Sequence, residues 1–281
     1  MQKLMVIGAG QMGSGIAQVA ATAGLTVHLR DVEDRFVQRG LGMIARNLDR
    51  DVEKGRKTPA QRAEILGRIH GTVDLAPAAE VDMAIEAIIE NLELKKALFK
   101  ELDALCPPGA ILATNTSSLP ITELAAATSR ADRFIGMHFM NPVPVMKLVE
   151  IIRGLATSEE TYGAVRLLAE RMEKVPVLVN DYPGFVSNRV LMPMINEAIF
   201  CLYEGIASKE DIDTVMKLGM NHPMGPLTLA DFIGLDTCLY IMDVLYDGFK
   251  DSKYRPCPLL VKMVKAGYLG KKSGRGFYSY E

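Results

Sequence analysis

The chain has 281 residues, of which 49% are hydrophobic, and a formal net charge of -2 at pH 7. This length accommodates one large or two modest domains, and interspersed acids and bases exclude the basic surface that nucleic-acid binding requires. Because no apolar stretch is long enough to span a membrane, and a strand-like segment starts at residue 3, we expect a cytoplasmic protein without a signal peptide.

A glycine-rich turn follows the first apolar segment. Lys3–Ile7 has the character of a buried strand, and GAGQMG at residues 8–13 comes directly after it. In such a turn the first glycine permits a sharp bend and the second lets the backbone approach a pyrophosphate. The third lets the next helix pack on the sheet, with its N-terminus toward the phosphates. We therefore predict a dinucleotide site that includes Gly8, Gly10, Gln11, Met12 and Gly13.

Asp31 indicates which dinucleotide binds. It ends the second apolar run, Leu25–Leu29. A carboxylate at the end of the second strand accepts hydrogen bonds from ribose hydroxyls and repels a 2′-phosphate, which favours NAD over NADP. Arg30 and Arg35 are near enough to contact a phosphate, so NADP remains an alternative, and the glycine pattern by itself also permits FAD.

A charged segment, about residues 42–70, is predicted to form a helical hairpin that breaks at Thr58-Pro59. Basic side chains recur along one face of its first helix: Arg46, Arg50, Lys54 and Lys57. One interpretation is a solvated charged face. The other is a contact with the phosphates of a large substrate, because like charges on one face repel one another and an anion would relieve them.

Strands and helices alternate up to the segment DYPG at 181–184, and only helices are predicted beyond it. We therefore predict an α/β fold: a Rossmann-type doubly wound parallel sheet in residues 1–184, then an all-α domain in residues 185–281. The apolar faces of the all-α domain favour a homodimer. The predicted later strands are 81–85, 111–114, 133–139, 147–152 and 175–179, and the predicted helices are 91–105, 158–173, 186–203, 209–218, 226–245 and 258–266.

His138 ends one predicted strand, and ligands of open parallel sheets bind beyond the carboxyl ends of the strands. Glu150 lies in another apolar strand, where an unpaired carboxylate would be costly to bury. If the two strands are neighbours, Glu150 can orient His138 as an acid–base pair. The alternatives are a structural histidine and a solvent-facing glutamate. His222 is a second candidate base, ranked lower because Pro223 indicates a rigid loop.

Polar residues flank these positions. In the turn 114–118, which follows a predicted strand, Ser117 can donate to a substrate oxygen, although a helix N-cap is an alternative role for this turn. Asn188 lies just beyond the domain boundary, where it can reach a cleft between the domains. The four cysteines contain no C-x-x-C pair and the four histidines are scattered, so we expect reduced thiols and no metal site.

Most of the chain resembles the short-chain L-3-hydroxyacyl-CoA dehydrogenase family, and within it the bacterial 3-hydroxybutyryl-CoA dehydrogenases in particular. The block GMHFMNPVPVMKLVEII is the most specific of the matching stretches. The others are GAGQMGSGIAQVAA, AIEAIIENLELKKALF, ATNTSSLPIT, PGFVSNRVLMPMINEA, KEDIDTVMKLGMNHPMGPL and LGKKSGRGFYSYE.

The resemblance implies an NAD-dependent oxidation of a 3-hydroxyacyl-CoA to the 3-ketoacyl-CoA. By the same resemblance, His138 is the general base paired with Glu150, and Ser117 and Asn188 hold the reacting oxygens. Lys54 matches a contact to CoA, which favours a substrate role for Lys54 and Arg50, whereas Asn47 stands where relatives can carry a serine. The remaining NAD contacts implied are Glu90, Lys95, Ser117, Asn141 and Lys272.

Two alternatives remain open at this point. A related dehydrogenase acting on a free hydroxy acid such as L-gulonate would share the architecture but would not need the basic helix. A non-catalytic NAD-binding protein would keep the fold, but the presence of both His138 and Glu150 disfavours it.

Overall fold

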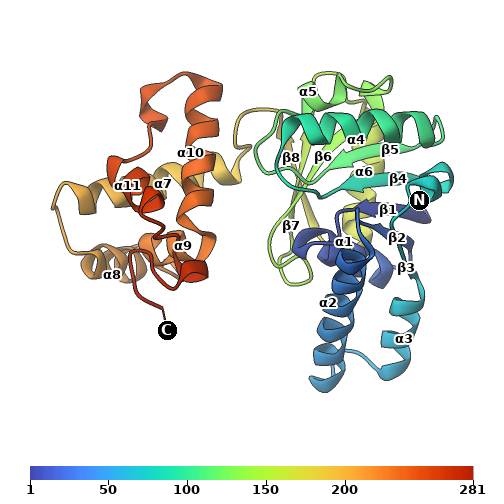
Figure 1. The fold of residues 1–281 in the computed structure, drawn as a ribbon, viewed down its shortest axis with the longest axis horizontal. Coiled ribbons are helices and arrows are strands. Elements are labelled where there is room, and N and C mark those ends of the chain that lie inside the picture. Colours follow the sequence, from blue (N-terminus) through green and yellow to red (C-terminus); the bar gives the residue numbers. More distant parts are fainter. Residues whose placement is uncertain (281) are drawn as a thin grey trace. The chain divides into compact units, whose positions relative to one another are not determined.

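The computed structural model describes residues 1–280 and divides into two compact units between Asp181 and Tyr182 (Figure 1). The first unit contains an eight-stranded sheet with helices on both faces, and the second is built from helices. The predicted fold class, a Rossmann-type α/β domain followed by an all-α domain, is confirmed. None of the helices in residues 1–280 is long and apolar enough to cross a membrane.

The sheet has the strand order β3-β2-β1-β4-β5-β6-β7-β8. All neighbours pair in parallel except β6 and β7, which are antiparallel, so the predicted parallel sheet contains one antiparallel pair. The physical reason is the connection after β6, which is too short for the crossover that a parallel neighbour requires. The strands are β1 Lys3–Ile7, β2 Thr26–Arg30, β3 Ile69–Thr72, β4 Met83–Glu86, β5 Ile111–Thr114, β6 Phe134–Phe139, β7 Leu148–Arg153 and β8 Val175–Asn180.

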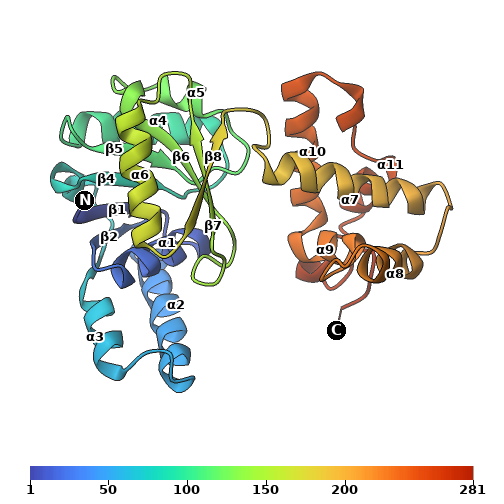
Figure 2. The ribbon, with the colours of Figure 1, turned by 180° about the vertical axis from the view of Figure 1, so that it is seen from behind.

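Two layers of helices cover the sheet (Figures 1 and 2). Helices α1 (Gln11–Thr22) and α6 (Glu159–Arg171) pack on one face, where they share a core with apolar residues of β1, β2 and β4–β7. Helices α4 (Leu92–Leu105) and α5 (Ile121–Ala125) cover the other face. Side chains alternate between the two faces along each strand.

Helices α2 (Asp34–Glu53) and α3 (Pro59–Gly67) form the expected hairpin, which projects beyond the sheet (Figures 1 and 2). Thr58 caps α3 in a capping box, and Pro59 opens the helix. Helix α2 begins earlier than the predicted hairpin and runs through Gly40. A Cβ at Gly40 would lie 2.7 Å from the Ala9 oxygen, so this glycine lets α2 approach the glycine turn closely.

The second unit contains helices on a core that includes Met192, Ile199, Leu227 and Leu245. The single helix predicted over 226–245 is two helices, because Gly234 adopts a φ of 100°, which an α-helix does not accommodate. The helices are α7 Ser187–Tyr203, α8 Lys209–Gly219, α9 Pro226–Ile233, α10 Leu235–Phe249 and α11 Pro258–Lys265.

Candidate active site

The three glycines of the turn after β1 meet three different requirements. Gly8 has a φ of 105°, which favours glycine. A Cβ at Gly13 would lie 1.7 Å from the Gly8 oxygen, so only glycine lets α1 start against the turn. A Cβ at Gly10 would meet nothing within 4 Å. The open space beside Gly10, at the N-terminus of α1, is therefore a cradle that suits the phosphates of a dinucleotide.

Asp31 is held against this turn by two backbone amides. Ala9 N donates to Asp31 Oδ2 and Val32 N donates to Asp31 Oδ1, each at 2.7 Å. A carboxylate oxygen has two acceptor sites, so each oxygen retains capacity for a ribose hydroxyl. Arg30 and Arg35 were the reason for retaining NADP as an alternative cofactor, and both have other partners. Arg30 Nε donates to the Val73 oxygen at 3.2 Å, and Arg35 pairs with Glu33 at 2.8 Å.

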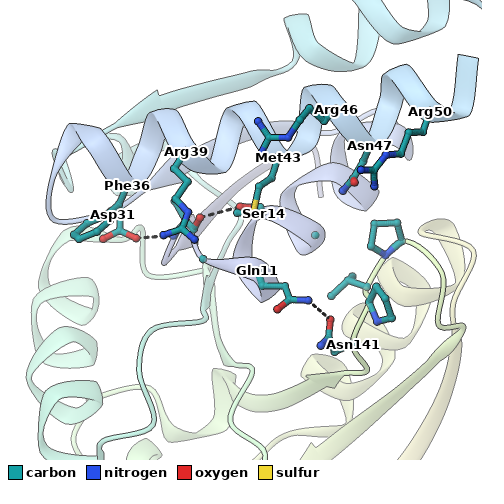
Figure 3. Close-up of a pocket in the computed structure, with 16 residues that line it drawn as sticks. Gln11, Ser14, Asp31, Phe36, Arg39, Met43, Arg46, Asn47, Arg50 and Asn141 are labelled. Atoms are coloured by element: carbon teal, nitrogen blue, oxygen red, sulfur yellow. Dashed lines mark hydrogen bonds between the residues drawn. The ribbon is translucent and has the colours of Figure 1, made fainter. Parts of the chain in front are cut away.

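Two cavities share Gly10, Asp31 and Phe36 in their walls. One has a volume of about 600 Å³ and a largely apolar lining that includes Ile88 and Leu98, which suits an adenine ring. The other has a volume of about 520 Å³ and lies between the start of α1, one face of α2 and residues 141–144 (Figure 3).

Three arginines of α2 line the second cavity, which we call the arginine cavity: Arg39, Arg46 and Arg50 (Figure 3). Within residues 1–280, no carboxylate lies within ion-pair distance of any of them. The acids on the same helix are used elsewhere, because Asp49 pairs with Arg62 at 2.6 Å and Asp51 pairs with Arg56 at 2.7 Å. Asp31 also lines this cavity but forms no ion pair with these arginines, so the wall that α2 contributes is positive, which is the electrostatic character of an anion site.

The predicted basic stripe is divided by the structure. Arg46 and Arg50 line the arginine cavity, and Asn47 joins them, with its Nδ2 donating to Gln18 Oε1 at 3.2 Å. Lys54 follows the end of α2, outside the residues that line this cavity, and Lys57 lines a separate, smaller pocket. Arg39 was not predicted as part of this stripe. It continues the helical spacing by seven residues toward the N-terminus, ahead of the point where the hairpin was predicted to begin.

His138 and Glu150 lie directly opposite one another in the antiparallel β6–β7 pair. His138 Nδ1 is 2.8 Å from Glu150 Oε2, and the two residues are 8% and 2% exposed. The burial of Glu150 excludes the solvent-facing alternative. When Glu150 is ionised, its carboxylate accepts a hydrogen bond from Nδ1–H, and a neutral imidazole in this tautomer has its lone pair on Nε2. This is the arrangement of an oriented general base.

A buried charge network lies at the ends of β4 and β5. The Lys95 ammonium pairs with Glu86 Oε1 at 2.6 Å and with Glu90 Oε2 at 3.1 Å, and both Lys95 and Glu86 are at most 1% exposed. Burial raises the pKa of Glu86. Burial would also raise the pKa of Glu90, but the Lys95 charge and the Thr116 hydroxyl outweigh it and lower this pKa.

Glu90 also holds the turn that carries Ser117. The Ser117 amide and hydroxyl donate to Glu90 Oε1 at 3.0 and 3.4 Å. Glu86, which the sequence analysis did not single out, completes the network by accepting from Thr114 Oγ1 at 2.7 Å. Like Glu150, Glu86 is a carboxylate in an apolar strand that needs a partner when buried, and this signal is present in the sequence.

The other expected site residues fall in both units. Asn141 Oδ1 accepts from Gln11 Nε2 at 2.9 Å, which connects the loop after β6 to the start of α1, and Met12 packs against the core. Asn188 and Lys272 belong to the second unit. Asn188 lies in the first turn of α7 and is 8% exposed, and the Lys272 ammonium pairs with Asp236 at 2.6 Å.

Comparisons with known proteins cover the whole length of the chain. Residues 3–182 match the family model of the 3-hydroxyacyl-CoA dehydrogenase NAD binding domain, and residues 184–280 match that of the C-terminal domain. The chain is 65% identical over 280 residues to a probable 3-hydroxybutyryl-CoA dehydrogenase of Bacillus subtilis, which covers 100% of this chain and 98% of the relative.

Two further relatives extend the range of the similarity. The mitochondrial hydroxyacyl-coenzyme A dehydrogenase of Homo sapiens is 44% identical over 98% of this chain and 90% of its own length. The crystal structure of (S)-3-hydroxybutyryl-CoA dehydrogenase from Ralstonia eutropha superposes with a TM-score of 0.98 at 53% identity, over 100% of this chain and 99% of that one.

The glycine turn generates a paired prediction. We expect Gly10→Ala to change the free energy of unfolding by less than about 1 kcal/mol, because its Cβ enters open space, yet to weaken NADH binding roughly tenfold or more, because the methyl group occupies the phosphate cradle. Gly13→Ala places a Cβ against the Gly8 oxygen and should destabilise the fold by about 3 kcal/mol or more. Urea denaturation and NADH fluorescence titration measure the two effects. Unchanged NADH affinity in Gly10→Ala would contradict the cradle.

Proposed function

Because the chain belongs to the 3-hydroxyacyl-CoA dehydrogenase family, we propose that it interconverts (S)-3-hydroxybutyryl-CoA and acetoacetyl-CoA with NAD as its cofactor. The reaction class, an NAD-dependent interconversion of a 3-hydroxyacyl-CoA and a 3-ketoacyl-CoA, is that of the family. The names of the relatives support the four-carbon substrate. The observation that carries the proposal is the buried His138–Glu150 pair at the carboxyl edge of a dinucleotide-binding sheet.

The acid–base chemistry follows from the protonation of this pair. His138 Nε2 takes the proton from the 3-hydroxyl group, and Glu150 stabilises the imidazolium that results, because its carboxylate accepts from Nδ1. Ser117 and Asn188 are proposed to donate hydrogen bonds to the substrate oxygen as its negative charge develops. In the reducing direction His138 returns the proton. When bound, NAD would supply the hydride acceptor for C3 in the oxidation, and NADH the hydride donor in the reduction.

The residues around the glycine turn fit NAD rather than NADP. The Gly10 cradle suits the phosphates, and Asp31 is pinned where it can accept from ribose hydroxyls and repel a 2′-phosphate. Both neighbouring arginines already have partners. The proposed NAD-binding residues are Gly8, Gly10, Gln11, Met12, Gly13, Asp31, Glu90, Lys95, Ser117, Asn141 and Lys272.

The arginine cavity favours a CoA thioester over a free hydroxy acid. CoA carries several phosphate charges, and charge-assisted hydrogen bonds from arginine suit phosphate geometry. Three arginines without carboxylate partners would be a cost without an anion to bind. We therefore assign Arg50 to substrate binding, as the sequence suggested, and add Arg39 and Arg46. Lys54 lies outside this cavity, and its proposed contact with CoA rests on the family resemblance alone. A free hydroxy acid such as L-gulonate carries no phosphate that these arginines could bind.

We also propose a homodimer formed through the helical unit. Val215, Leu218 and Met220, on α8 and at its end, are 59%, 82% and 61% exposed. Apolar side chains gathered on one short element are typical of an interface.

The four free cysteines, three of them buried, are consistent with reduced thiols in the cytoplasm.

The first prediction from the proposed function concerns the base. We expect His138→Gln to lower kcat about 10³-fold, since general acid–base catalysis contributes 10²–10⁴-fold, while the NADH dissociation constant changes by less than about twofold. His222→Gln is the matched control and should keep kcat, because His222 lies outside the β6–β7 pair. Steady-state reduction of acetoacetyl-CoA measures both variants. Retained turnover in His138→Gln, or its loss in His222→Gln, would reject the assignment.

The second prediction concerns the arginine cavity. The double variant Arg46→Ala/Arg50→Ala should raise KM for acetoacetyl-CoA about tenfold or more, equivalent to roughly 1.4 kcal/mol, and should reduce the salt dependence of KM. Arg62→Ala removes a guanidinium already paired with Asp49, so KM should stay unchanged in this control. An unaltered KM in the double variant would instead favour a free hydroxy acid as substrate.

The third prediction concerns assembly. Sedimentation equilibrium should give twice the 30.8 kDa chain mass, and Leu218→Asp should shift the distribution toward the single chain, because burying a carboxylate at an apolar interface is costly. Glu210→Gln, on the exposed first turn of the same helix, is the control that should leave the mass unchanged. A wild-type protein with the mass of one chain would refute the dimer.

A further inference from the structure

Lys174 is a buried lysine in the turn between α6 and β8. It is 7% exposed, and within residues 1–280 no carboxylate lies within ion-pair distance of its ammonium. Its Nζ instead donates to two backbone carbonyls, that of Val143 at 2.5 Å and that of Met146 at 2.9 Å. Burial lowers the pKa of Lys174. A buried cation is costly, so its contacts with these carbonyls require an explanation.

Both carbonyls belong to the loop that connects β6 to β7. Within this loop the amides of Val145 and Met146 donate to the Pro142 oxygen at 3.0 and 2.9 Å, which folds it into a tight turn. The loop leaves β6 directly after the His138 strand end and leads into β7, which carries Glu150. Lys174 thus satisfies two acceptors of a loop that lies at the proposed active site.

The opposite side of the same loop packs against α1. A Cβ at Gly15 would lie 2.7 Å from Val143 Cβ, and Val143 is 2% exposed. The absence of a side chain at Gly15 therefore allows the loop to pack directly on α1. Gln11 Nε2 donates to Asn141 Oδ1 at 2.9 Å and adds a polar contact beside this packing. The loop is therefore held from two sides, by the first helix after the glycine turn and by the ammonium.

We propose that Lys174 is a positioning residue that presses the β6–β7 loop against α1, where the loop presents Asn141 to the cofactor and forms one wall of the arginine cavity. The wall consists of Asn141, Pro142, Val143 and Pro144. The inference rests on the proposed function for the identity of the ligands. The roles of Lys174 and Gly15 are separate from proton transfer, because the hydrogen-bonded register of β6 and β7 determines the positions of His138 and Glu150.

The proposal distinguishes binding from chemistry. Lys174→Met keeps the length of the side chain but donates no hydrogen bond, so the buried Val143 carbonyl and the part-buried Met146 carbonyl lose their partner and the loop relaxes away from α1. We expect the dissociation constant for NADH and KM for acetoacetyl-CoA each to rise about tenfold, with kcat within about threefold of the wild type. Lys174→Arg retains a donor and should restore both binding constants to within about threefold.

The matched control is Lys147→Met, because Lys147 is exposed and lines the same small surface pocket as Lys174. It should leave every constant unchanged. NADH fluorescence titration without acyl-CoA is the primary measurement, so the result does not depend on the identity of the substrate. If Lys174→Met lowers Tm but leaves NADH affinity unchanged, the residue has a structural role only and the proposal fails. If the NADH shift appears but acetoacetyl-CoA is not reduced by the wild type, the substrate assignment fails instead.

A double-mutant cycle tests whether the two sides act on one loop. Gly15→Ala places a methyl group against Val143 and should also weaken NADH binding severalfold. Because either change displaces the same loop, the effect of Gly15→Ala/Lys174→Met should be clearly smaller than the product of the single effects. Effects that multiply would show two independent sites and would overturn the proposal.

Discussion

The antiparallel pairing of β6 with β7 is the constraint on which the candidate site depends. Strands β1, β4, β5 and β6 are parallel and end at one edge of the sheet, so the glycine turn, the Glu86 network and His138 gather there. Strand β7 starts at that edge and runs back, which brings Glu150 directly opposite His138. A parallel neighbour would need a long crossover in place of the short loop that Lys174 and α1 hold.

The acidic groups at the candidate site of the first unit have charged or hydrogen-bonding partners, whereas the arginines that line the arginine cavity lack a carboxylate partner in the described part of the chain. The buried Glu86 and the part-buried Glu90 share the Lys95 ammonium, and Glu150 pairs with His138. The arginines of α2 that face the cavity have no such partner among residues 1–280, although acids on the same helix pair with arginines outside it. Because unpaired like charges repel one another, this wall is most stable with an anion bound.

Several features were predictable from local sequence because local physics determines them. The glycine turn, the Thr58 cap with Pro59 and the apolar strands each depend on residues close in the chain, and they lie where the sequence indicated. Strand β3 was missed because Ile69–Thr72 is a short edge strand without an apolar run. The early start of α2 was missed because Gly40 weakens the helical pattern. The reason for a glycine at this position is its close approach to Ala9, which is far away in the sequence.

The sequence by itself determined the fold class, the dinucleotide turn and the candidates His138, Glu150 and Ser117, since strand ends and glycine spacing are legible in a linear chain. Only the tertiary structure decided which strand lies beside which, and hence that the imidazole and the carboxylate are 2.8 Å apart. It also decided which basic residues line a cavity and that Lys174 caps carbonyls 28 and 31 residues away. Strand order and side-chain partners depend on contacts between distant segments, and local periodicity carries no information about them.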